Sequence, residues 1–556
     1  MSWDSLPLEI YQQIFQNLDF WDRKPLSLVC RRWNQAVFSR SLCRNLCIEL
    51  SRGDWNQYGD TEQVVVVDDE VVEASDRDYR VVYVKWCKDS DPGVLGSIDR
   101  VLRELDEKCQ LEGLIIDAPL DQKLSNFLRT HGELLARIKK LQVSTETMDC
   151  SVKMDRCVIQ MDRLETLFWR EVVTKDHLQY REPLFMIDAP KLQSAVVRFG
   201  DSDSDSGIVW HNGFLELNRC ANLKALKVHL HPRMWNGFFE QRLDALEHLT
   251  ISHKTQDLEA RDWDAMFSNM PNLKSIQMWE VNDIILEAIN RHCPYLRVLL
   301  LDNVDLTGGF LSENRAFPQL EHLRLESAKI QSNKTLHLPL LKHLEWFNVK
   351  NQGDQLLTLA APMLRTLRQS KQGVPDFVLT SKSPLEKLQL DLYESDIPSH
   401  FFQSFPNMRD LSIRVSSACP ALDRMIPHFR NITEFNMIAY NAPLQCDQML
   451  IEMFKSCEHV TSLTLCGFNP NLELSFPVFA QIFRNRNLKS LKLLGLTITG
   501  NSFPLQLPPE LETFELRNVK VMDMAFGAYV FPPDEPFRVR CNKGDDYCCY
   551  FSKDCE

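Results

Sequence analysis

A short apolar pattern, L-x-x-L-x-L, recurs along most of this 556-residue chain and restricts its possible folds more than any other feature. Regular copies begin at Leu273, Leu296, Leu320, Leu341, Leu364, Leu385 and Met408, with starts 23, 24, 21, 23, 21 and 23 residues apart. Further copies begin before them at Leu111, Leu164, Leu223 and Leu246, and after them at Ile432, Val460, Leu488 and Leu511. Units this short cannot bury their apolar side alone, so they should stack into one elongated array.

Each copy predicts a short strand with one buried face, because apolar and other residues alternate along it. Several connecting segments predict helices, such as 255–270 and 282–293, where apolar residues recur at spacings of three and four. A proline often stands just before the next strand, as in MPNL, CPYL and FPQL, and would end such a helix. The repeat unit therefore predicts helix, turn and strand, with all strands parallel in one sheet.

The repeat pattern and its spacing resemble those of leucine-rich-repeat proteins. The resemblance implies an α/β fold class: a curved leucine-rich-repeat solenoid, or horseshoe, with parallel strands on the concave face and helices on the convex face. One feature departs from the family. The asparagine or cysteine that usually follows the strand is replaced by Val304, Ala328, Val349, Leu496 and Val519. The backbone carbonyls that this side chain would satisfy need other partners.

The first forty residues have a different pattern. Residues 3–18, WDSLPLEIYQQIFQNL, predict a helix with an apolar face, capped by Asp4 or Ser5 and with Pro7 in its first turn. A second amphipathic helix is predicted from Asp22, with Pro25 in its opening turn. So few residues cannot enclose so much apolar surface, which indicates that part of it is offered to another chain or packs on the rest of this one.

The order LPLEIYQQIFQNL, then LSLVCRRW, resembles an F-box over residues 3 to about 45. The resemblance implies binding to a Skp adaptor, and through it to a cullin. The positions it implies for adaptor contact or support are Leu6, Pro7, Ile10, Ile14, Phe15, Leu18, Val29, Cys30 and Trp33. Two positions depart from the family: Arg23 replaces a leucine and Pro25 a more regular helix former.

The domain organisation expected from these two patterns has four parts. They are an N-terminal helical F-box domain at 1–48, a connecting segment at 49–74, a leucine-rich-repeat domain at 75–530 and a C-terminal tail at 531–556.

The residues between the buried leucines of each strand should face outward and could bind a protein substrate. Large aromatic and arginine side chains among them resemble the anchors of protein interfaces. The candidates are Phe168, Trp279, Arg324, Phe347 and Arg368. The alternative is that Trp279 and Phe347 only cover their neighbours within the sheet.

Composition and motifs exclude several other classes of protein. The net charge of -13, with no long basic stretch, argues against nucleic acid as a partner. No secretory leader and no run of about 18 apolar residues is found, so a cytoplasmic or nuclear protein without a membrane span is expected. The 17 cysteines should be reduced and mostly buried, and those near the C-terminus do not have metal-site spacing.

No catalytic or cofactor motif is present, so the sequence predicts a non-enzymatic chain without a cofactor. The acidic run at 200–207 is interpreted as a solvated loop, with a regulatory phosphorylation site as the alternative. The main hypothesis is a substrate receptor of a Skp–cullin–F-box ubiquitin ligase, which captures a protein for ubiquitination and proteasomal degradation. The alternative is a repeat scaffold or inhibitor that acts outside any ligase.

Overall fold

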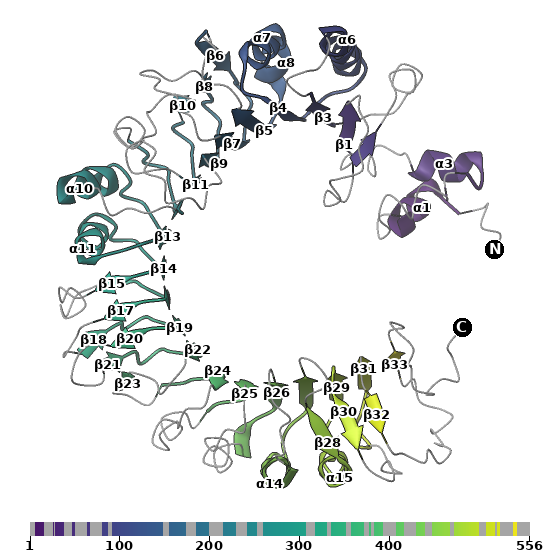
Figure 1. The fold of residues 1–556 in the computed structure, drawn as a ribbon, viewed down its shortest axis with the longest axis vertical. Helices are drawn as coiled ribbons and strands as arrows, with labels where there is room; N and C mark the ends of the chain where they lie inside the picture. The colour runs from purple at the N-terminus through teal and green to yellow at the C-terminus, as the bar shows by residue number, and fades with distance from the viewer. Residues whose placement is uncertain are drawn as a thin grey trace. The chain divides into compact units, whose positions relative to one another are not determined.

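The computed structural model divides into two compact units, Met1–Gln277 and Met278–Glu556 (Figure 1). The residues that the structure describes are 6–15, 26, 28–37, 47–50, 64–66, 80–86, 92–147, 155–173, 185–199, 215–218, 220–229, 242–252, 259–306, 317–330, 335–351, 357–371, 377–379, 383–392, 407–415, 430–439, 447–467, 472–499, 508–517, 520–522 and 538–541. Leu18, Arg23, Pro25, the acidic run 200–207 and Val519 lie outside these residues.

The first unit begins with two short helices and continues as a parallel sheet. Its helices are α1 (Leu8–Phe15), α3 (Arg31–Val37), α6 (Pro92–Lys108), α7 (Gln122–Thr130), α8 (Gly132–Arg137) and α10 (Ala260–Ser268). Its main sheet pairs, in order, β2 (Val64–Val66), β1 (Cys47–Leu50), β3 (Val81–Lys85), β4 (Gly113–Pro119), β5 (Lys140–Thr147), β7 (Thr166–Val173), β9 (Ser194–Phe199), β11 (Ala225–His229) and β12 (His248–Ile251). A smaller sheet contains β6 (Cys157–Gln160), β8 (Phe185–Asp188) and β10 (Leu215–Asn218).

The second unit is a longer parallel sheet, and β13 (Ser275–Trp279) spans the boundary between the units. The sheet pairs, in order, β14 (Val298–Asp302), β16 (His322–Glu326), β19 (His343–Phe347), β22 (Thr366–Lys371), β24 (Lys387–Leu392), β25 (Asp410–Val415), β26 (Glu434–Ala439), β27 (Ser462–Gly467), β29 (Ser490–Leu494), β31 (Thr513–Arg517) and β33 (Arg538–Cys541). Its helices are α11 (Asp283–His292), α14 (Asp447–Ser456) and α15 (Phe476–Phe483).

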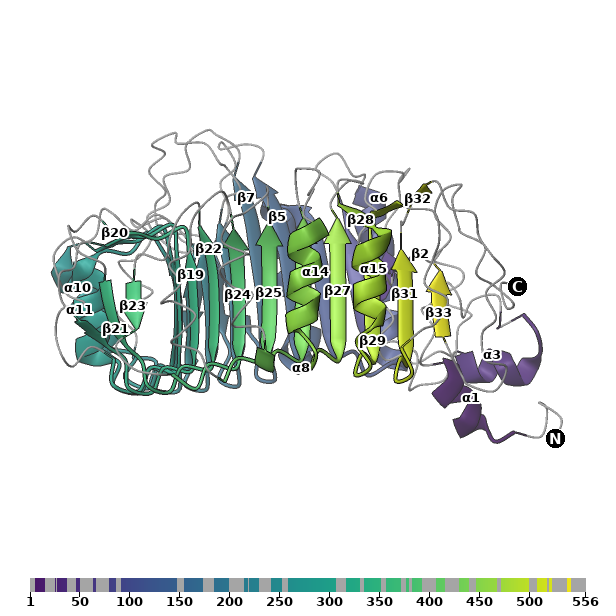
Figure 2. The ribbon, with the colours of Figure 1, turned by 90° about the horizontal axis from the view of Figure 1, so that it is seen from below.

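Three small parallel sheets accompany the large sheet of the second unit. They contain β15 (Asp305–Leu306), β17 (Lys329–Ile330) and β20 (Lys350–Asn351); then β18 (Thr335–His337), β21 (Leu357–Ala360) and β23 (Phe377–Leu379); and then β28 (Glu473–Ser475), β30 (Thr497–Thr499) and β32 (Lys520–Met522). Figure 2 shows α14 and α15 lying over one face of the strands around β27 and β29. No described helix lies on the other face of these strands, called the open face below (Figure 1). The predicted fold class, a parallel repeat sheet with its helices on one side, is confirmed.

The L-x-x-L-x-L pattern produces the sheet through alternating burial. In β16, Leu323 and Leu325 are buried, whereas Arg324 between them lies on the open face. The pairing register places Leu323 beside Leu344 of β19, so the leucines of successive repeats stack. Burial of each leucine side chain contributes about 1.5–3 kcal/mol. The stacked leucines therefore hold the repeats together and fix which side chains face outward.

The turns after the strands explain how the family's missing asparagine is replaced. Asn303, Ser327 and Asn348 follow their strands with positive φ angles of 51°, 52° and 48°. The N–H of Asn303 donates to the carbonyl of Glu326 at 2.9 Å, and the N–H of Ser327 donates to Phe347 at 2.9 Å. Backbone groups of adjacent repeats thus satisfy one another, without a side-chain amide.

The apolar residues that replace the asparagine follow these turns and are buried. The set comprises Val304, Ala328, Val349 and Leu496. The carbonyl of Val304 accepts from Lys329 at 2.7 Å, and that of Ala328 accepts from Lys350 at 2.7 Å. These bonds belong to the small sheet of β15, β17 and β20, so the turn carries its own ladder of hydrogen bonds.

The connecting segments agree only in part with the predicted helix, turn and strand unit. Helices α10 and α11 occur where the spacing of apolar residues predicts them. In the repeats between β16 and β24, however, the described parts of the connecting segments, called returns below, contain the short strands β18, β21 and β23. These returns carry too few apolar residues at helical spacing, and β pairing between neighbouring returns satisfies their backbone instead.

The sheet also extends past the expected bounds of the repeat domain. Strands β1 and β2 begin at Cys47 and Val64, before residue 75, and β1 pairs in parallel with β3. Strand β33 begins at Arg538, within the segment expected to be a tail, and pairs with β31. These strands lack the full leucine pattern, and their pairing to a neighbouring strand places them in the sheet.

The described cysteines are free thiols, and most are buried. Burial raises the pKa of Cys293 and of Cys457 to about 12. Burial, followed by the negative charge of Asp188, raises the pKa of Cys220 to about 12. These three cysteines are therefore neutral, apolar parts of the core at physiological pH.

Gly495 is the turn residue whose conformation depends most on the absence of a side chain. It has a φ of 59°, and an added methyl group would collide with the carbonyl oxygen of Gly467. We expect Gly495→Ala to lower the free energy of unfolding by about 1–3 kcal/mol, measured by urea denaturation. As a control, Gly96→Ala within α6, where no atom lies within 4 Å of the added carbon, should be neutral or stabilising by about 0.5–1 kcal/mol. Equal effects of the two substitutions would contradict this interpretation.

Candidate functional site

The N-terminal helices pack around a small aromatic core. In α1, Tyr11 and Phe15 are buried, with ring centroids 6.0 Å apart. The ring of Trp33 in α3 lies 5.9 Å from Tyr11 and 5.4 Å from Phe15. Leu6 also packs against this cluster. Phe15, Trp33 and Leu6 therefore support the fold of the segment, whichever partner it binds.

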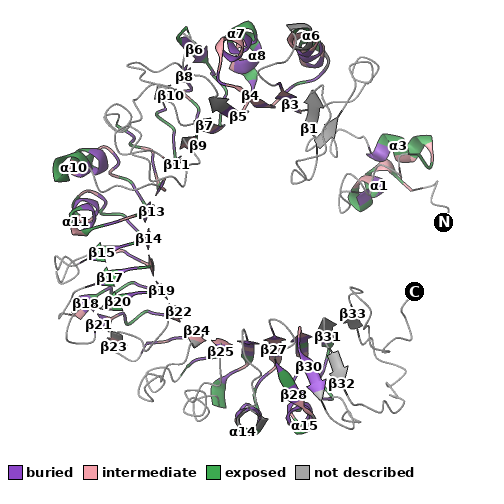
Figure 3. Cartoon of the chain, in the orientation of Figure 1, coloured by how far each residue is buried: buried purple, intermediate pink, exposed green. Residues whose placement is uncertain are grey.

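A second stripe of α1 is left partly uncovered. Ile10 and Ile14 lie one helical turn apart and are 37% and 38% exposed. Leu28 and Val29, which precede α3, are 84% and 61% exposed. Figure 3 shows buried, intermediate and exposed residues on both α1 and α3. Of the ten exposed large hydrophobic side chains in the described part of the chain, these four fall within twenty residues of one another. Exposed apolar side chains gathered in one segment are typical of a surface that a partner covers.

The helix predicted from Asp22 differs in the structure. Residues 28 and 29 form a turn, in which the N–H of Val29 donates to the carbonyl of Leu26 at 3.2 Å, and α3 then begins at Arg31. Cys30 stands at the start of α3, and its sulfur accepts the N–H of Trp33 at 3.4 Å. This restart takes Val29 out of the helix and leaves it exposed, although the sequence places it on the apolar side of one continuous helix.

Three of the five residues predicted to bind a substrate come together on the open face of the second unit. Arg324, Phe347 and Arg368 belong to the consecutive strands β16, β19 and β22. The guanidinium carbons of Arg324 and Arg368 lie 5.4 Å and 5.6 Å from the ring centroid of Phe347. The aromatic ring is therefore flanked by two cations, an arrangement in which each contact contributes about 0.5–1 kcal/mol.

Acidic side chains hold these two arginines in place. Arg324 pairs with Glu326, and this hydrogen bond raises the pKa of Arg324. Arg368 lies 3.6 Å from Glu345, and its Nε donates to the side chain of Gln389 at 3.1 Å. The cluster Arg324–Phe347–Arg368, with Glu326 and Glu345, is called the arginine–phenylalanine cluster below.

Two further ionisable groups border the cluster. His322 Nε2 lies 3.4 Å from Glu345; burial lowers the pKa of His322, and the charge of Glu345 opposes this effect. Burial, followed by the charge of Glu326, raises the pKa of Asp302 on the preceding strand. The cluster has alternating charges and a half-buried ring, which suits an interface anchor. It does not place a nucleophile beside a base.

The other two predicted substrate residues lie elsewhere. Phe168 is in the first unit, where Arg198 of the next strand covers its ring at 5.6 Å. Trp279, at the end of β13, is 44% exposed. Phe168 is therefore covered by a neighbouring side chain, whereas Trp279 is exposed.

Metal and membrane functions receive no support from the residues that the structure describes. Among them, no group of three or more His, Cys, Asp or Glu side chains is arranged to hold a metal ion. No described helix combines the length and apolar character needed to cross a bilayer.

Sequence reasoning missed a polar groove at the N-terminal ends of strands β24 to β31. The sequence of the repeats does contain a feature that distinguishes this groove. The residue after the first apolar position is charged in most copies, but it is threonine in ITEFNM and VTSLTL. Two short side chains in succession at this position leave space beside the sheet.

Among the comparisons with known proteins, a family model matches the N-terminal segment. Residues 3–49 match the family model described as F-box-like. A structure described as a TLR13–ssRNA13 complex is 12% identical, with a TM-score of 0.42, over 89% of this chain and 72% of that chain. A PEPR1–AtPEP1 structure is 13% identical, with a TM-score of 0.24, over 82% and 74%. No curated protein sequence matches the chain. The repeat fold is assigned here from the strand register of the chain itself.

The contact between His322 and Glu345 can be tested by titration. Because the charge of Glu345 opposes the lowering of the His322 pKa, we expect Glu345→Gln to lower this pKa further. The measurement is a proton NMR titration of the histidine ring signals. Glu326→Gln removes a nearby carboxylate that does not contact His322 and should leave its pKa unchanged. An unchanged His322 pKa in Glu345→Gln would show that the two side chains do not interact.

Proposed function

We propose that this chain, an F-box-like segment followed by a leucine-rich-repeat array, is the substrate-recognition subunit of a Skp–cullin–F-box ubiquitin ligase. The observation that carries the proposal is the exposed apolar surface of Ile10, Ile14, Leu28 and Val29 within the segment that matches the F-box-like model. F-box domains typically bind a Skp adaptor, and an uncovered apolar stripe beside a packed aromatic core supports this use.

The open face of the repeats would then hold the substrate protein. The arginine–phenylalanine cluster supports this role, because arginine and aromatic side chains supply much of the binding energy at protein interfaces. A partner with acidic and aromatic side chains complements it. Carboxylates can exchange with Glu326 and Glu345 as ion-pair partners of the arginines, and a second ring can stack on Phe347.

The proposed role requires positioning and no chemistry from this chain. A separate conjugating enzyme supplies the activated ubiquitin, while the receptor raises the local concentration of the substrate. The chain would act in the cytoplasm or the nucleus, where ubiquitin ligases of this type operate. The alternative is a repeat scaffold that binds the adaptor outside a ligase, or does not bind it, and co-purification of cullin separates these roles.

Docking of the adaptor is tested with Ile10→Glu combined with Ile14→Glu. Two charges placed in an apolar interface, with the loss of about 1.5–3 kcal/mol for each isoleucine, should weaken adaptor binding at least about 100-fold. Affinity is measured with purified adaptor, and co-purified cullin is measured from cells. Ile284→Glu on α11 is the matched control, because it replaces an equally exposed isoleucine outside the segment. Full adaptor binding by the double variant would refute the proposed surface.

Substrate capture is tested with Phe347→Ala combined with Arg368→Gln. Proximity labelling in cells with the proteasome inhibited should lose the proteins that accumulate with the unaltered chain, because the central contacts of the cluster are removed. Adaptor binding should persist. Thr464→Ala, an outward position on β27 away from the cluster, should retain the same labelled proteins. An identical set of labelled proteins in the double variant would place the substrate elsewhere.

A further inference from the structure

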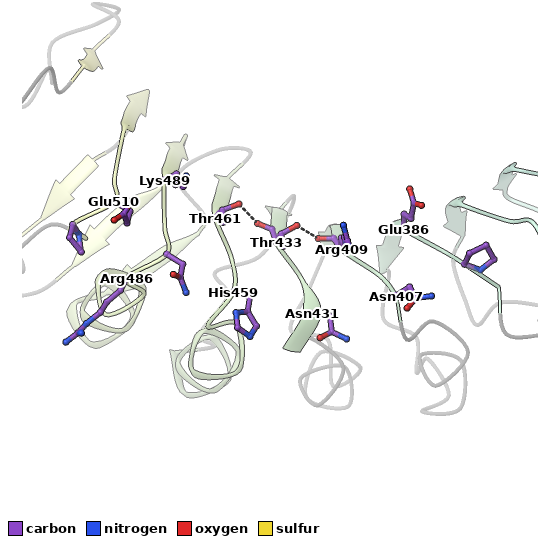
Figure 4. Close-up of a pocket in the computed structure, with 13 residues that line it drawn as sticks. Glu386, Asn407, Arg409, Asn431, Thr433, His459, Thr461, Arg486, Lys489 and Glu510 are labelled. Atoms are coloured by element: carbon purple, nitrogen blue, oxygen red, sulfur yellow. Dashed lines mark hydrogen bonds between the residues drawn. The ribbon is translucent and has the colours of Figure 1, made fainter.

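The groove at the strand starts of the second unit has a volume of about 1020 Å³ and lies between two rows of side chains (Figure 4). The first row consists of the residue immediately before each strand. The second row consists of the residue two positions before that one. The first row comprises Glu386, Arg409, Thr433, Thr461 and Lys489. The second row includes Asn407, Asn431, His459 and Asn487. The groove is therefore at the N-terminal ends of β24 to β31, whereas the arginine–phenylalanine cluster is on the open face of β16, β19 and β22.

The groove exists because two repeats have short side chains at a position that is usually long and charged. In other repeats this position forms ion pairs between neighbours, such as Glu247 with Lys274 at 2.9 Å and Glu321 with Lys342 at 2.7 Å. In the groove, the hydroxyl of Thr433 donates to the carbonyl of Arg409 at 3.3 Å. The hydroxyl of Thr461 donates to the carbonyl of Thr433 at 3.1 Å. Both threonines thus lie close to the backbone and leave the space above them open.

Three cationic and two acidic side chains line the groove. Arg409 and Lys489 stand on either side of the two threonines, and Arg486 also lines the groove, away from Lys489 (Figure 4). No described residue forms an ion pair with Arg409 or Arg486. Lys489 lies 3.9 Å from Glu512, but both side chains are at least half exposed, so this pair is weak. Within a chain of net charge -13, this is a local concentration of available cations.

The second row adds hydrogen-bonding groups for a polar chain. The amide of Asn487 donates to the carbonyl of Glu458 at 2.8 Å and so is fixed beside the groove. Within the described part of the chain, Asn407 and His459 have no side-chain hydrogen bond. Amide and imidazole groups of this kind bind the N–H and C=O groups of an extended peptide.

We propose that this groove binds an extended protein segment carrying two acidic side chains, which pair with Arg409 and Lys489. The strands β25, β26, β27 and β29 are consecutive, so three strand spacings, roughly 14 Å, separate the two cations. An extended peptide rises about 3.3 Å per residue, so acidic residues four positions apart span a similar distance. Glu386 and Glu510 at the two ends repel further acidic residues and restrict the negative charge to the middle.

This site goes beyond the proposed ligase role and does not depend on it. The groove uses neither the N-terminal helices nor the arginine–phenylalanine cluster. Recognition of an acidic segment would operate equally in a scaffold, and loss of adaptor binding would leave it intact.

The test uses the full chain and fluorescein-labelled peptides of twelve residues, followed by fluorescence anisotropy. One set has two glutamates fixed four residues apart with the other positions varied, and the matched set has glutamines in their place. We expect members of the glutamate set to bind at least about tenfold more tightly than their glutamine counterparts. Equal binding of the two sets, no binding by either set, or tighter binding of a labelled ten-nucleotide single-stranded DNA would overturn the proposal.

Two double variants locate the binding. Arg409→Glu with Lys489→Glu should weaken the best glutamate peptide by about tenfold or more, because both contacts become repulsive. Arg365→Glu is the control: it reverses an exposed arginine at the same repeat position, one strand outside the groove, and should leave affinity unchanged.

Thr433→Gln with Thr461→Gln should also abolish binding by filling the space without a change of charge. The fold should tolerate it, because Gln193 occupies the same repeat position in the first unit. Unchanged melting temperatures verify folding in all variants. Retention of peptide binding in both double variants would show that the groove is not the site.

Discussion

A backbone carbonyl just before each strand accepts the N–H groups of two consecutive residues in the next repeat. The carbonyl of Glu321, for example, accepts from Lys342 at 2.8 Å and from His343 at 3.0 Å. The same arrangement recurs from Arg80 to Glu247 in the first unit and from Arg297 to Lys489 in the second. It fixes the register of each strand against the next before the strand begins. The leucine stacks, the rows of outward side chains and the paired charges at the strand starts all depend on this register.

The register also explains why residues far apart in the sequence form one cluster. Arg324, Glu345 and Arg368 occupy the same position in three consecutive strands, so their side chains are neighbours. Each strand spacing is about 4.8 Å, which brings opposite charges within ion-pair distance and lets two guanidinium groups flank one ring. Outward side chains of a repeat sheet thus interact mainly along rows, from one repeat to the next.

Much of the fold could be predicted from the sequence, because alternating leucines have one favourable arrangement as stacked strands. Helices α10 and α11 were also predictable from their apolar spacing. The returns between β16 and β24 were not, since their small strands depend on hydrogen bonds to neighbouring returns and have no pattern of their own. Strands β2 and β33 each pair with one neighbour, β1 and β31, in the sheets of their own units, and a leucine pattern does not record this pairing.

The candidate sites, like the fold, could be predicted only in part from the sequence. The outward positions of Arg324, Phe347 and Arg368 follow from alternation, but their mutual contacts require the register. At the N-terminus, the apolar stripe of Ile10 and Ile14 follows from helical spacing, whereas the exposure of Val29 depends on a turn at residues 28 and 29, before α3 begins at Arg31. The groove was missed because it results from the short side chains of Thr433 and Thr461. A motif search identifies the residues that are present, and the space beside a short side chain forms no motif.

At each strand start, one backbone carbonyl accepts two N–H groups of the next repeat. The strand register therefore does not depend on the length of the connecting segments. Strand starts can remain in line while the connecting segments lengthen or shorten, because the register is set locally at each step. Gain or loss of one whole repeat would therefore keep every row of outward side chains continuous. It would change the distance between the side chains on either side of that repeat by a single strand spacing. Such an array can change its recognition pattern by duplication of genetic segments, without a new core.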